Sequence, residues 1–344
     1  MRALDHQLLA VNGINLSLYS AGPADGRPLW LLHGFPECWL SWRHQLEPLL
    51  AAGYQVFIPE MRGYGQSSAP QAVEAYDLLT VCGDIQAAMD VLGQEQVCVI
   101  GHDWGAPIAW HLALLEPKRV KAVVGMAVPF GGRPKQPAIG IMQQLYAGRF
   151  HYILHFQTPG VAEAEMDADI PRTLRWMMHN LSAAVPKDLF LQDKPAGAGL
   201  FDGLQQVEQL PAWCSPEAFA GYVATFSGRG FRGALNWYRN FERNWQRTEG
   251  LAGRQIEQPA LFLLGDLDPV GTLEAYTLKQ MPKRVLQLEQ EQLDGAALIQ
   301  SLAQQNAQVI QAVEDLRQRN RRLTLVVTVL ACTCIGLLVW AFKQ

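Results

Sequence analysis

One stretch, V-C-V-I-G-H-D-W-G-A at residues 97–106, constrains the fold of this chain more than any other. Val97 to Ile100 has the apolar, β-branched character of a short buried strand, and Pro107 to Leu115 is predicted to be a helix. The G-x-D-x-G between them indicates a tight turn, in which strand and helix come so close that the outer positions have no room for a Cβ atom. The central side chain, Asp103, is therefore expected to project from the turn.

An aspartate raised from such a turn has two interpretations. Its carboxylate could attack carbon directly and leave an alkyl ester on the protein, which a second step would have to cleave. Alternatively, the segment is a plain strand–turn–helix corner in which Asp103 caps the helix that follows.

The chain around this turn alternates strands with helices. Strands are expected at 6–20 (two, around the turn Asn12-Gly13), 29–32, 55–58, 97–100 and 122–128, and helices at 39–50, 80–92 and 107–115. The alternation predicts an α/β fold with a mostly parallel sheet that helices cover on both faces. In such sheets the chemistry lies outside the carboxyl ends of the strands.

The pattern changes between the two expected parts of the sheet. Residues 129–245 are mostly helical in character, rich in aromatic side chains and broken by prolines, so we expect a helical cap inserted over the sheet. The sheet resumes with strands at 260–264 and 285–288. The predicted core domain is therefore 1–128 together with 246–288.

Composition excludes several classes of protein. The formal net charge is -4 and the body carries no basic stripe, so no nucleic-acid partner is expected. The six cysteines are scattered without metal-ligand spacing, which suits a reducing compartment, and we expect no metal and no cofactor. The first residues lack the apolar segment of a secretory signal.

A tail of different composition follows residue 288. Apolar residues and two asparagines recur at spacings of three and four, at Ile299, Leu302, Asn306, Val309, Val313, Leu316, Asn320 and Leu323. This pattern predicts a coiled-coil-like helix over 289–322, and asparagine at two a positions favours a parallel homodimer. The alternative is an amphipathic helix packed on the chain's own sheet.

The tail ends in a run that could cross a membrane. Leu323 to Phe342 contains no charged residue and would be about 30 Å long as a helix, at about 1.5 Å per residue. Arginines cluster before this run, which predicts a single-pass C-terminal anchor with the rest of the chain cytoplasmic. A buried helix of a cytoplasmic protein is the alternative, and the change in composition also fits a joined reading frame.

Five motifs, taken in order, carry a resemblance to a known family. They are H-G-F-P-E (33–37), R-G-Y-G-Q-S (62–67), G-H-D-W-G-A (101–106), F-H-Y-I-L-H-F-Q-T-P-G-V-A-E (150–163) and F-R-G-A-L-N-W-Y-R-N (231–240). Over about residues 5–288 the chain resembles the epoxide hydrolases of the α/β-hydrolase family. The resemblance implies an α/β-hydrolase sheet with a helical cap, and hydrolysis of a small apolar epoxide to a diol.

The resemblance also implies roles for particular residues. Asp103 would be the nucleophile, Tyr152 and Tyr238 the two cap tyrosines, and Asp268 the acid that orients a histidine. Such tyrosines make chemical sense, because the oxygen of an epoxide is a poor leaving group and two phenols can stabilise its developing charge. Alternatively, both are core tyrosines bonded to backbone carbonyls, and Asp268 belongs to a solvated loop.

Ester cleavage needs donors for a tetrahedral oxyanion. The backbone N–H groups of Phe35 and Trp104 are expected to supply them, since one follows a strand and the other begins the helix after the turn. The substrate pocket is predicted to be lined by four aromatic side chains, Phe35, Trp104, Phe150 and Trp237. His33 and His102 are expected to be structural.

The sequence departs from the family at one essential point. A histidine should follow the last strand to activate the water that cleaves the ester, yet the last histidine of the chain is His179, within the predicted cap. We therefore expect slow or stalled turnover. Two alternatives stay open, namely a membrane-anchored pseudo-enzyme that binds an apolar ligand, and a haloalkane dehalogenase, against which the paired tyrosines argue.

Overall fold

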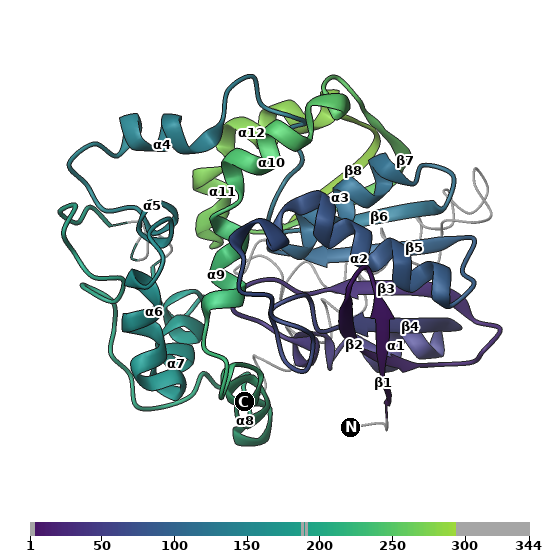
Figure 1. Cartoon of the computed structure of the whole chain (residues 1–344), viewed down its shortest axis with the longest axis horizontal. Helices are drawn as coiled ribbons and strands as arrows, with labels where there is room; N and C mark the ends of the chain where they lie inside the picture. The colour runs from purple at the N-terminus through teal and green to yellow at the C-terminus, as the bar shows by residue number, and fades with distance from the viewer. Residues whose placement is uncertain (1–3, 187–188, 190–191, 294–344) are drawn as a thin grey trace.

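The computed structural model describes residues 4–186, 189 and 192–293. Within these ranges the chain forms one eight-stranded sheet in the order β1-β2-β4-β3-β5-β6-β7-β8 (Figure 1). The strands are β1 (Asp5–Val11), β2 (Ile14–Ala21), β3 (Arg27–Leu32), β4 (Tyr54–Pro59), β5 (Val97–His102), β6 (Val120–Met126), β7 (Ile256–Gly265) and β8 (Val285–Leu293). β1 pairs antiparallel with β2, and β2 pairs antiparallel with β4. The six strands β4, β3, β5, β6, β7 and β8 are parallel to one another, as predicted.

Helices cover both faces of the sheet because its strands are apolar on both sides. Along β3, Trp30 and Leu32 belong to one buried cluster, whereas Leu29 and Leu31 belong to the other. α2 (Leu78–Val91) and α3 (Gly105–Leu115) pack on the first side, and α1 (Leu46–Ala51) packs on the second. This double burial is the reason that these strands carry continuous apolar runs instead of an alternating pattern.

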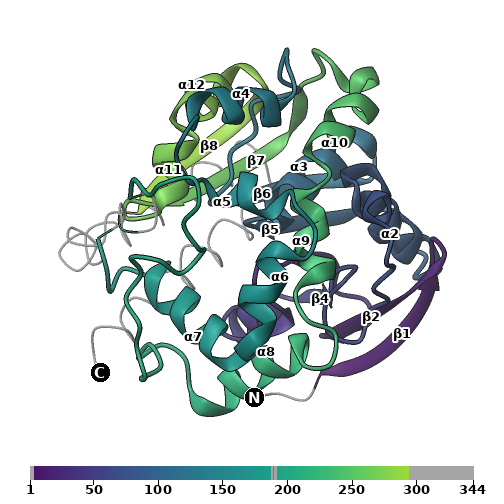
Figure 2. The ribbon, with the colours of Figure 1, turned by 60° about the vertical axis from the view of Figure 1, so that its left-hand side comes forward.

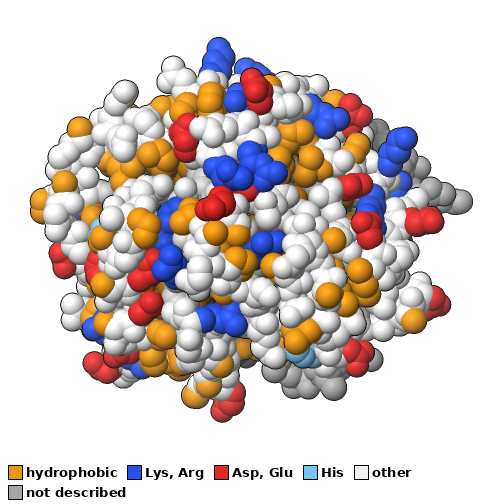
Figure 3. Space-filling model, viewed as in Figure 1, with side chains coloured by type: hydrophobic (Ala, Val, Ile, Leu, Met, Phe, Trp, Pro, Cys, Tyr) orange, Lys and Arg blue, Asp and Glu red, His pale blue; other side chains and the backbone are white. Residues whose placement is uncertain are grey.

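The segment between β6 and β7 is helical, as predicted. It contains α4 (Ala138–Leu145), α5 (Tyr152–Phe156), α6 (Val161–Met166), α7 (Ile170–Asn180), α8 (Pro216–Phe226), α9 (Arg232–Tyr238) and α10 (Phe241–Arg247). Figures 1 and 2 show α5 to α8 gathered at one end of the sheet, while α9 and α10 return toward it. Figure 3 shows the same face as Figure 1, where basic and acidic side chains gather over the junction between these helices and the sheet.

Short elements complete the described chain. They are the 3-10 helices η1 (Trp39–Trp42), η2 (Val73–Tyr76), η3 (Asp167–Asp169), η4 (Glu249–Leu251) and η5 (Met281–Lys283), and the helices α11 (Pro269–Leu273) and α12 (Ala275–Gln280) between β7 and β8. The single helix predicted for 39–50 is wrong, because this segment forms η1 and α1 with a turn between them. Pro48 fits only the first turn of a helix, where its missing N–H leaves no bond unmade, so a helix starts just before it.

The last strand extends beyond its predicted end. β8 continues to Leu293 and pairs in parallel with β7 as far as Gly265, so residues 289–293 are strand and not the start of a helical tail. The backbone donors and acceptors of β7 outweigh the weak local preference of a Gln- and Glu-rich segment. The coiled coil and the membrane span predicted for 294–342 lie outside the described residues. Among the residues that are described, no helix is both long and apolar enough to cross a membrane.

Candidate active site

The turn after β5 has the strained geometry that its glycines predict. The backbone of Asp103 adopts a φ of 49°, in the left-handed region that side chains other than glycine rarely occupy. A Cβ atom on Gly101 would lie 2.0 Å from the carbonyl oxygen of Gly105, and one on Gly105 would lie 2.1 Å from that of Leu32. Only glycine fits at either position, so strand and helix close tightly and Asp103 stands at the carboxyl end of β5.

The loop after β3 holds the carboxylate of Asp103. The backbone N–H of Phe35 donates to Asp103 Oδ1 at 2.7 Å, and the N–H of Trp104 also donates to this carboxylate. A Cβ on Gly34 would lie 2.3 Å from the Cβ of Asp103, so glycine is what allows the loop to come so near. Two amides that converge on one carboxylate can equally stabilise an oxyanion that forms on it.

Burial changes the pKa of the Asp103 carboxylate. Desolvation raises the pKa of Asp103 to about 6, against the lowering effects of His102 and of the amides of Phe35 and Trp104. Asp103 is therefore largely ionised at pH 7 yet only weakly solvated, which is the state that a carboxylate nucleophile needs.

The two predicted cap tyrosines lie close together. Tyr238 ends α9 and is buried, and its ring centroid lies 6.1 Å from that of Tyr152 in α5. Burial raises the pKa of both phenols, and the negative charge of Asp103 raises it further. Both hydroxyls therefore remain protonated at neutral pH, and both lie within electrostatic reach of Asp103.

Aromatic rings enclose Tyr238 on several sides. Its ring meets those of Phe35 and Trp104 edge-on, at centroid distances of 5.3 Å and 5.1 Å. The ring centroids of Trp237 and Trp104 are 5.8 Å apart, and Trp237 Nε1 donates a hydrogen bond to the carbonyl oxygen of Arg62. Three of the four predicted pocket residues, Phe35, Trp104 and Trp237, therefore come together.

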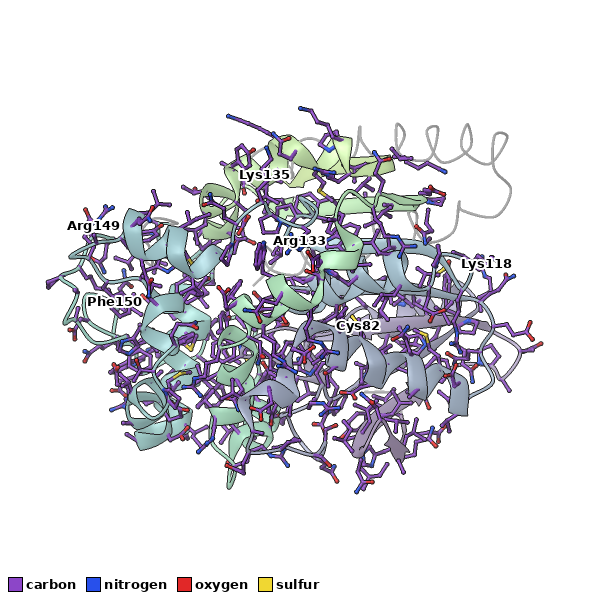
Figure 4. All side chains as sticks on the ribbon, turned by 45° about the horizontal axis from the view of Figure 1, so that its top comes forward. Cys82, Lys118, Arg133, Lys135, Arg149 and Phe150 are labelled. Carbon is purple, nitrogen blue, oxygen red and sulfur yellow. The ribbon has the colours of Figure 1, made fainter. Side chains whose placement is uncertain are left out.

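The fourth predicted pocket residue lies in different surroundings. The ring of Phe150 packs against His155 at a centroid distance of 5.1 Å, and the Lys194 ammonium sits 4.2 Å from the ring centre. Figure 4 shows Phe150 toward the outer side of the cap. Its place in the substrate pocket stays a prediction.

Asp268 follows β7, at the same edge of the sheet as Asp103. It is the N-cap of α11, where its Oδ1 accepts from the N–H of Val270 at 2.9 Å. Burial raises its pKa, and its charge acts on His102 and Tyr152. The acid predicted to orient a base is thus near the other groups of the site, and in the described residues its carboxylate serves as a helix cap.

The two histidines near the site differ in their surroundings. His33 is buried, donates from Nδ1 to the carbonyl oxygen of Gly34 at 3.0 Å and accepts the N–H of Met61 at Nε2, and burial lowers its pKa. It is structural, as expected. His102 instead has its Nδ1 3.0 Å from the carboxylate of Glu37. Burial opposes a charge on this ring, but Glu37 outweighs burial and raises the pKa of His102 to about 9.

Glu37 is the residue of this site that sequence reasoning missed. Its carboxylate accepts from the N–H of Gly34 at 2.9 Å and pairs with His102, so it ties the loop after β3 to the turn that carries Asp103. The signal was available, because an acid closes the H-G-F-P-E motif and a histidine directly precedes Asp103.

The histidine that the family resemblance leads us to expect after the last strand is absent from the sequence. β8 ends at Leu293, and no histidine follows that residue in the sequence. His179 lies in α7, where its Nε2 is bonded to Gln205 at 2.9 Å. Within the described ranges, no three His, Cys, Asp or Glu side chains are arranged to hold a metal ion.

Comparison with known proteins identifies the family of the chain. The sequence matches the alpha/beta hydrolase fold family over residues 27–296. It is 41% identical over 273 residues to epoxide hydrolase A of Mycobacterium tuberculosis, covering 79% of this chain and 85% of the relative. Epoxide hydrolase 3 of Siraitia grosvenorii is 39% identical over 271 residues, covering 78% of this chain and 82% of the relative.

Solved structures give the same result. The crystal structure of epoxide hydrolase A from Mycobacterium thermoresistibile superposes with a TM-score of 0.80 at 42% identity, covering 85% of this chain and 92% of that one. The epoxide hydrolase from an endophytic Streptomyces superposes with a TM-score of 0.82 at 34% identity, covering 92% of this chain and 97% of that one.

Proposed function

The chain belongs to the epoxide hydrolases of the alpha/beta hydrolase fold, and we propose that it opens small apolar epoxides by forming an alkyl ester on Asp103. The observation that supports this proposal is that a buried carboxylate with a pKa of about 6 acts electrostatically on two protonated phenols, whose ring centroids are 6.1 Å apart. The aromatic surroundings of Tyr238 favour an apolar substrate.

The first step uses only groups that precede β7. The Asp103 carboxylate attacks one ring carbon, the bond from that carbon to the epoxide oxygen breaks, and an ester forms. Tyr152 and Tyr238 donate hydrogen bonds to the leaving oxygen, and one of them transfers its proton to that oxygen, which becomes the alcohol of the ester. The phenolate left behind regains a proton from water. Because both phenols are buried, they act in surroundings where a hydrogen bond to a developing charge is worth more than in water.

The second step is the one that this sequence impairs. Water must attack the ester carbonyl, and the N–H groups of Phe35 and Trp104 are suited to hold the resulting oxyanion. Without a histidine after β8, no side chain of the predicted kind is present to take a proton from that water. General-base catalysis contributes about 10²–10⁴-fold, so we expect ester cleavage to be slower by about that factor.

Intact-mass spectrometry tests this proposal directly. Incubation with styrene oxide should add the mass of one substrate molecule to most of the protein, and diol should appear slowly. Asp103→Ala should show no added mass. An unchanged mass for the unsubstituted protein, with no diol formed, would rule out epoxide chemistry at this site.

Two additional measurements separate the alternatives. A protein that only binds an apolar ligand would show neither the added mass nor the diol, while still binding the epoxide in a calorimetric titration. A haloalkane dehalogenase would release halide from a panel of chloroalkanes, and the paired tyrosines give no reason to expect that release.

The C-terminal run carries a separate proposal, that it anchors the protein to a membrane with the enzyme domain in the cytoplasm. Its support is the uncharged stretch from Leu323 to Phe342 behind a cluster of arginines. Replacing Val329 and Leu330 by arginine should move the protein from the membrane pellet to the supernatant. If both forms stay in the supernatant, the chain has no anchor.

Cross-linking of Asn306→Leu and Asn320→Leu variants would test the homodimer in the same preparation.

A further inference from the structure

A cavity lies outside the Asp103 site, at the junction between the cap helices and the sheet domain. Its volume is about 450 Å³, within the range of small-molecule sites. Its walls come from the segment at 69–76 before α2, from α6 and η3, and from residues 228–233 at the start of α9. The basic side chains that Figure 3 shows in the middle of the face lie over this junction.

Two arginines line the cavity with donors to spare. Arg229 donates from one terminal nitrogen to the carbonyl oxygen of Ser67 at 2.8 Å, and Arg232 reaches that of Gln71 only at 3.5 Å. Neither forms an ion pair with any carboxylate in the part of the chain that the structure describes. A guanidinium has five N–H donors in a planar fork, so most of theirs are available to a ligand.

The acids that line the cavity are already engaged within the protein. Glu163 pairs with Arg239 at 2.7 Å and accepts from the N–H of Gly160, and Asp167 accepts from the N–H of Phe231 at 2.8 Å. With Arg239 included, three arginines face two carboxylates, which leaves one uncompensated positive charge. A ligand with one negative charge balances this surplus.

The remaining walls favour an organic body on that anion. Ala69, Pro70 and Tyr76 give an apolar side, and the Tyr76 hydroxyl is occupied with the carbonyl oxygen of Pro70 at 2.8 Å. A phosphate fits less well, because its second charge would lie near Asp167, whose pKa burial and Glu163 already raise. A carboxylate matches the planar fork of arginine with a single charge.

We propose that this cavity binds a small organic carboxylate, with Arg229 and Arg232 holding the carboxylate group and the apolar side holding the body. The cavity is distinct from the Asp103 site. Phe231 lies between the cavity and the Asp103 site. Its N–H donates to Asp167 at the cavity wall, and its ring centroid lies 6.3 Å from that of Phe35. The proposal therefore does not depend on epoxide chemistry.

Calorimetric titration with benzoate tests the proposal, with inorganic phosphate at the same ionic strength as the comparison. Benzoate should bind at one site and more tightly than phosphate. Arg229→Gln combined with Arg232→Gln should weaken benzoate binding at least about tenfold, because it removes two charge-assisted pairs. Arg232→Gln alone serves as a second variant and should weaken benzoate binding severalfold. It should not disturb folding, because Arg232 is exposed and its side chain, within the described residues, makes only the 3.5 Å contact with the carbonyl oxygen of Gln71.

The matched control removes the same number of charges elsewhere. Lys118 and Lys121 are exposed before and at the start of β6, and Figure 4 shows Lys118 at the end of the molecule away from the cap. Lys118→Gln combined with Lys121→Gln should bind benzoate like the unsubstituted protein. The proposal is overturned if benzoate does not bind, if phosphate binds more tightly, or if the arginine and lysine variants lose the same affinity.

Discussion

Replacing Tyr238 by phenylalanine removes one hydroxyl from the proposed site and leaves its packing in place. The ring meets those of Phe35, Trp104 and Phe156 edge-on at centroid distances of 5.0–5.3 Å. This packing does not need the oxygen, which makes a hydrogen bond with the Trp104 side chain. We therefore expect the free energy of unfolding to change by no more than about 1 kcal/mol, the usual net value of one hydrogen bond.

The effect on ring opening should be far larger. In buried surroundings, loss of one donor to a developing oxyanion costs about 10²–10³ in rate, or about 2.7–4 kcal/mol. Burial and Asp103 keep the pKa of both phenols high, so Tyr152 alone remains a protonated donor in the variant. Tyr238→Phe should thus retain slow ester formation, and Tyr152→Phe with Tyr238→Phe should abolish it.

Single-turnover experiments measure this step separately from ester cleavage. The fraction of alkylated protein is followed by intact mass after mixing with excess styrene oxide, and the melting temperature of each variant is measured in the same buffer. A decrease of less than about threefold for Tyr238→Phe, with an unchanged melting temperature, would show that its hydroxyl does not assist the leaving oxygen. The reasoning would also fail if the single variant were fully inactive, because Tyr152 would then supply nothing.

Four further predictions concern the same site. The rate of ester formation should fall about tenfold per pH unit below about 6 and level off above it, because protonated Asp103 cannot attack; stopped-flow rates between pH 4.5 and 8 measure this. Imidazole added at about 0.1 M should speed release of the diol from the alkylated protein without changing the rate of alkylation, since it supplies the missing base. Gly101→Ala should lower the free energy of unfolding by about 3 kcal/mol or more, seen in denaturant titration, because its Cβ would lie 2.0 Å from a backbone oxygen. In Glu37→Gln the pKa of His102 should fall from about 9, because burial is then opposed only by the smaller effects of the Asp103 and Asp268 charges; NMR titration of the ring tests this.

The turn at Asp103 could be predicted from sequence because its geometry excludes every residue but glycine at two positions. Gly101 and Gly105 are required by backbone atoms less than 2.2 Å from where a Cβ would stand, so the pattern itself carries the structure. The parallel sheet was equally predictable, since strands buried on both faces must be apolar throughout. Both features are local or follow from burial alone.

Features set by distant parts of the chain were not predictable. The pairing of Glu37 with His102 joins residues 65 positions apart. Each stands in a recognisable motif, but the sequence does not show that the two side chains meet. The extension of β8 to Leu293 depends on the length of β7, not on its own Gln- and Glu-rich composition. Phe150 shares a motif with Tyr152, yet its ring packs on Lys194, which lies in a segment of the cap that the motif does not include.

The groups proposed for the two half-reactions come from different parts of the chain. Every group proposed for ring opening comes from the loop after β3, the turn after β5, or the cap helices α5 and α9. Contacts between Phe35, Asp103, Tyr152 and Tyr238 join these segments directly. The proposed ester cleavage also needs a base, which the family resemblance places after the last strand. A change confined to that segment can therefore stop the second step and leave the first intact. Under the proposed mechanism, this chain keeps the groups for ring opening and has no histidine after β8, so a long-lived covalent adduct on Asp103 is the expected product of its reaction with an epoxide.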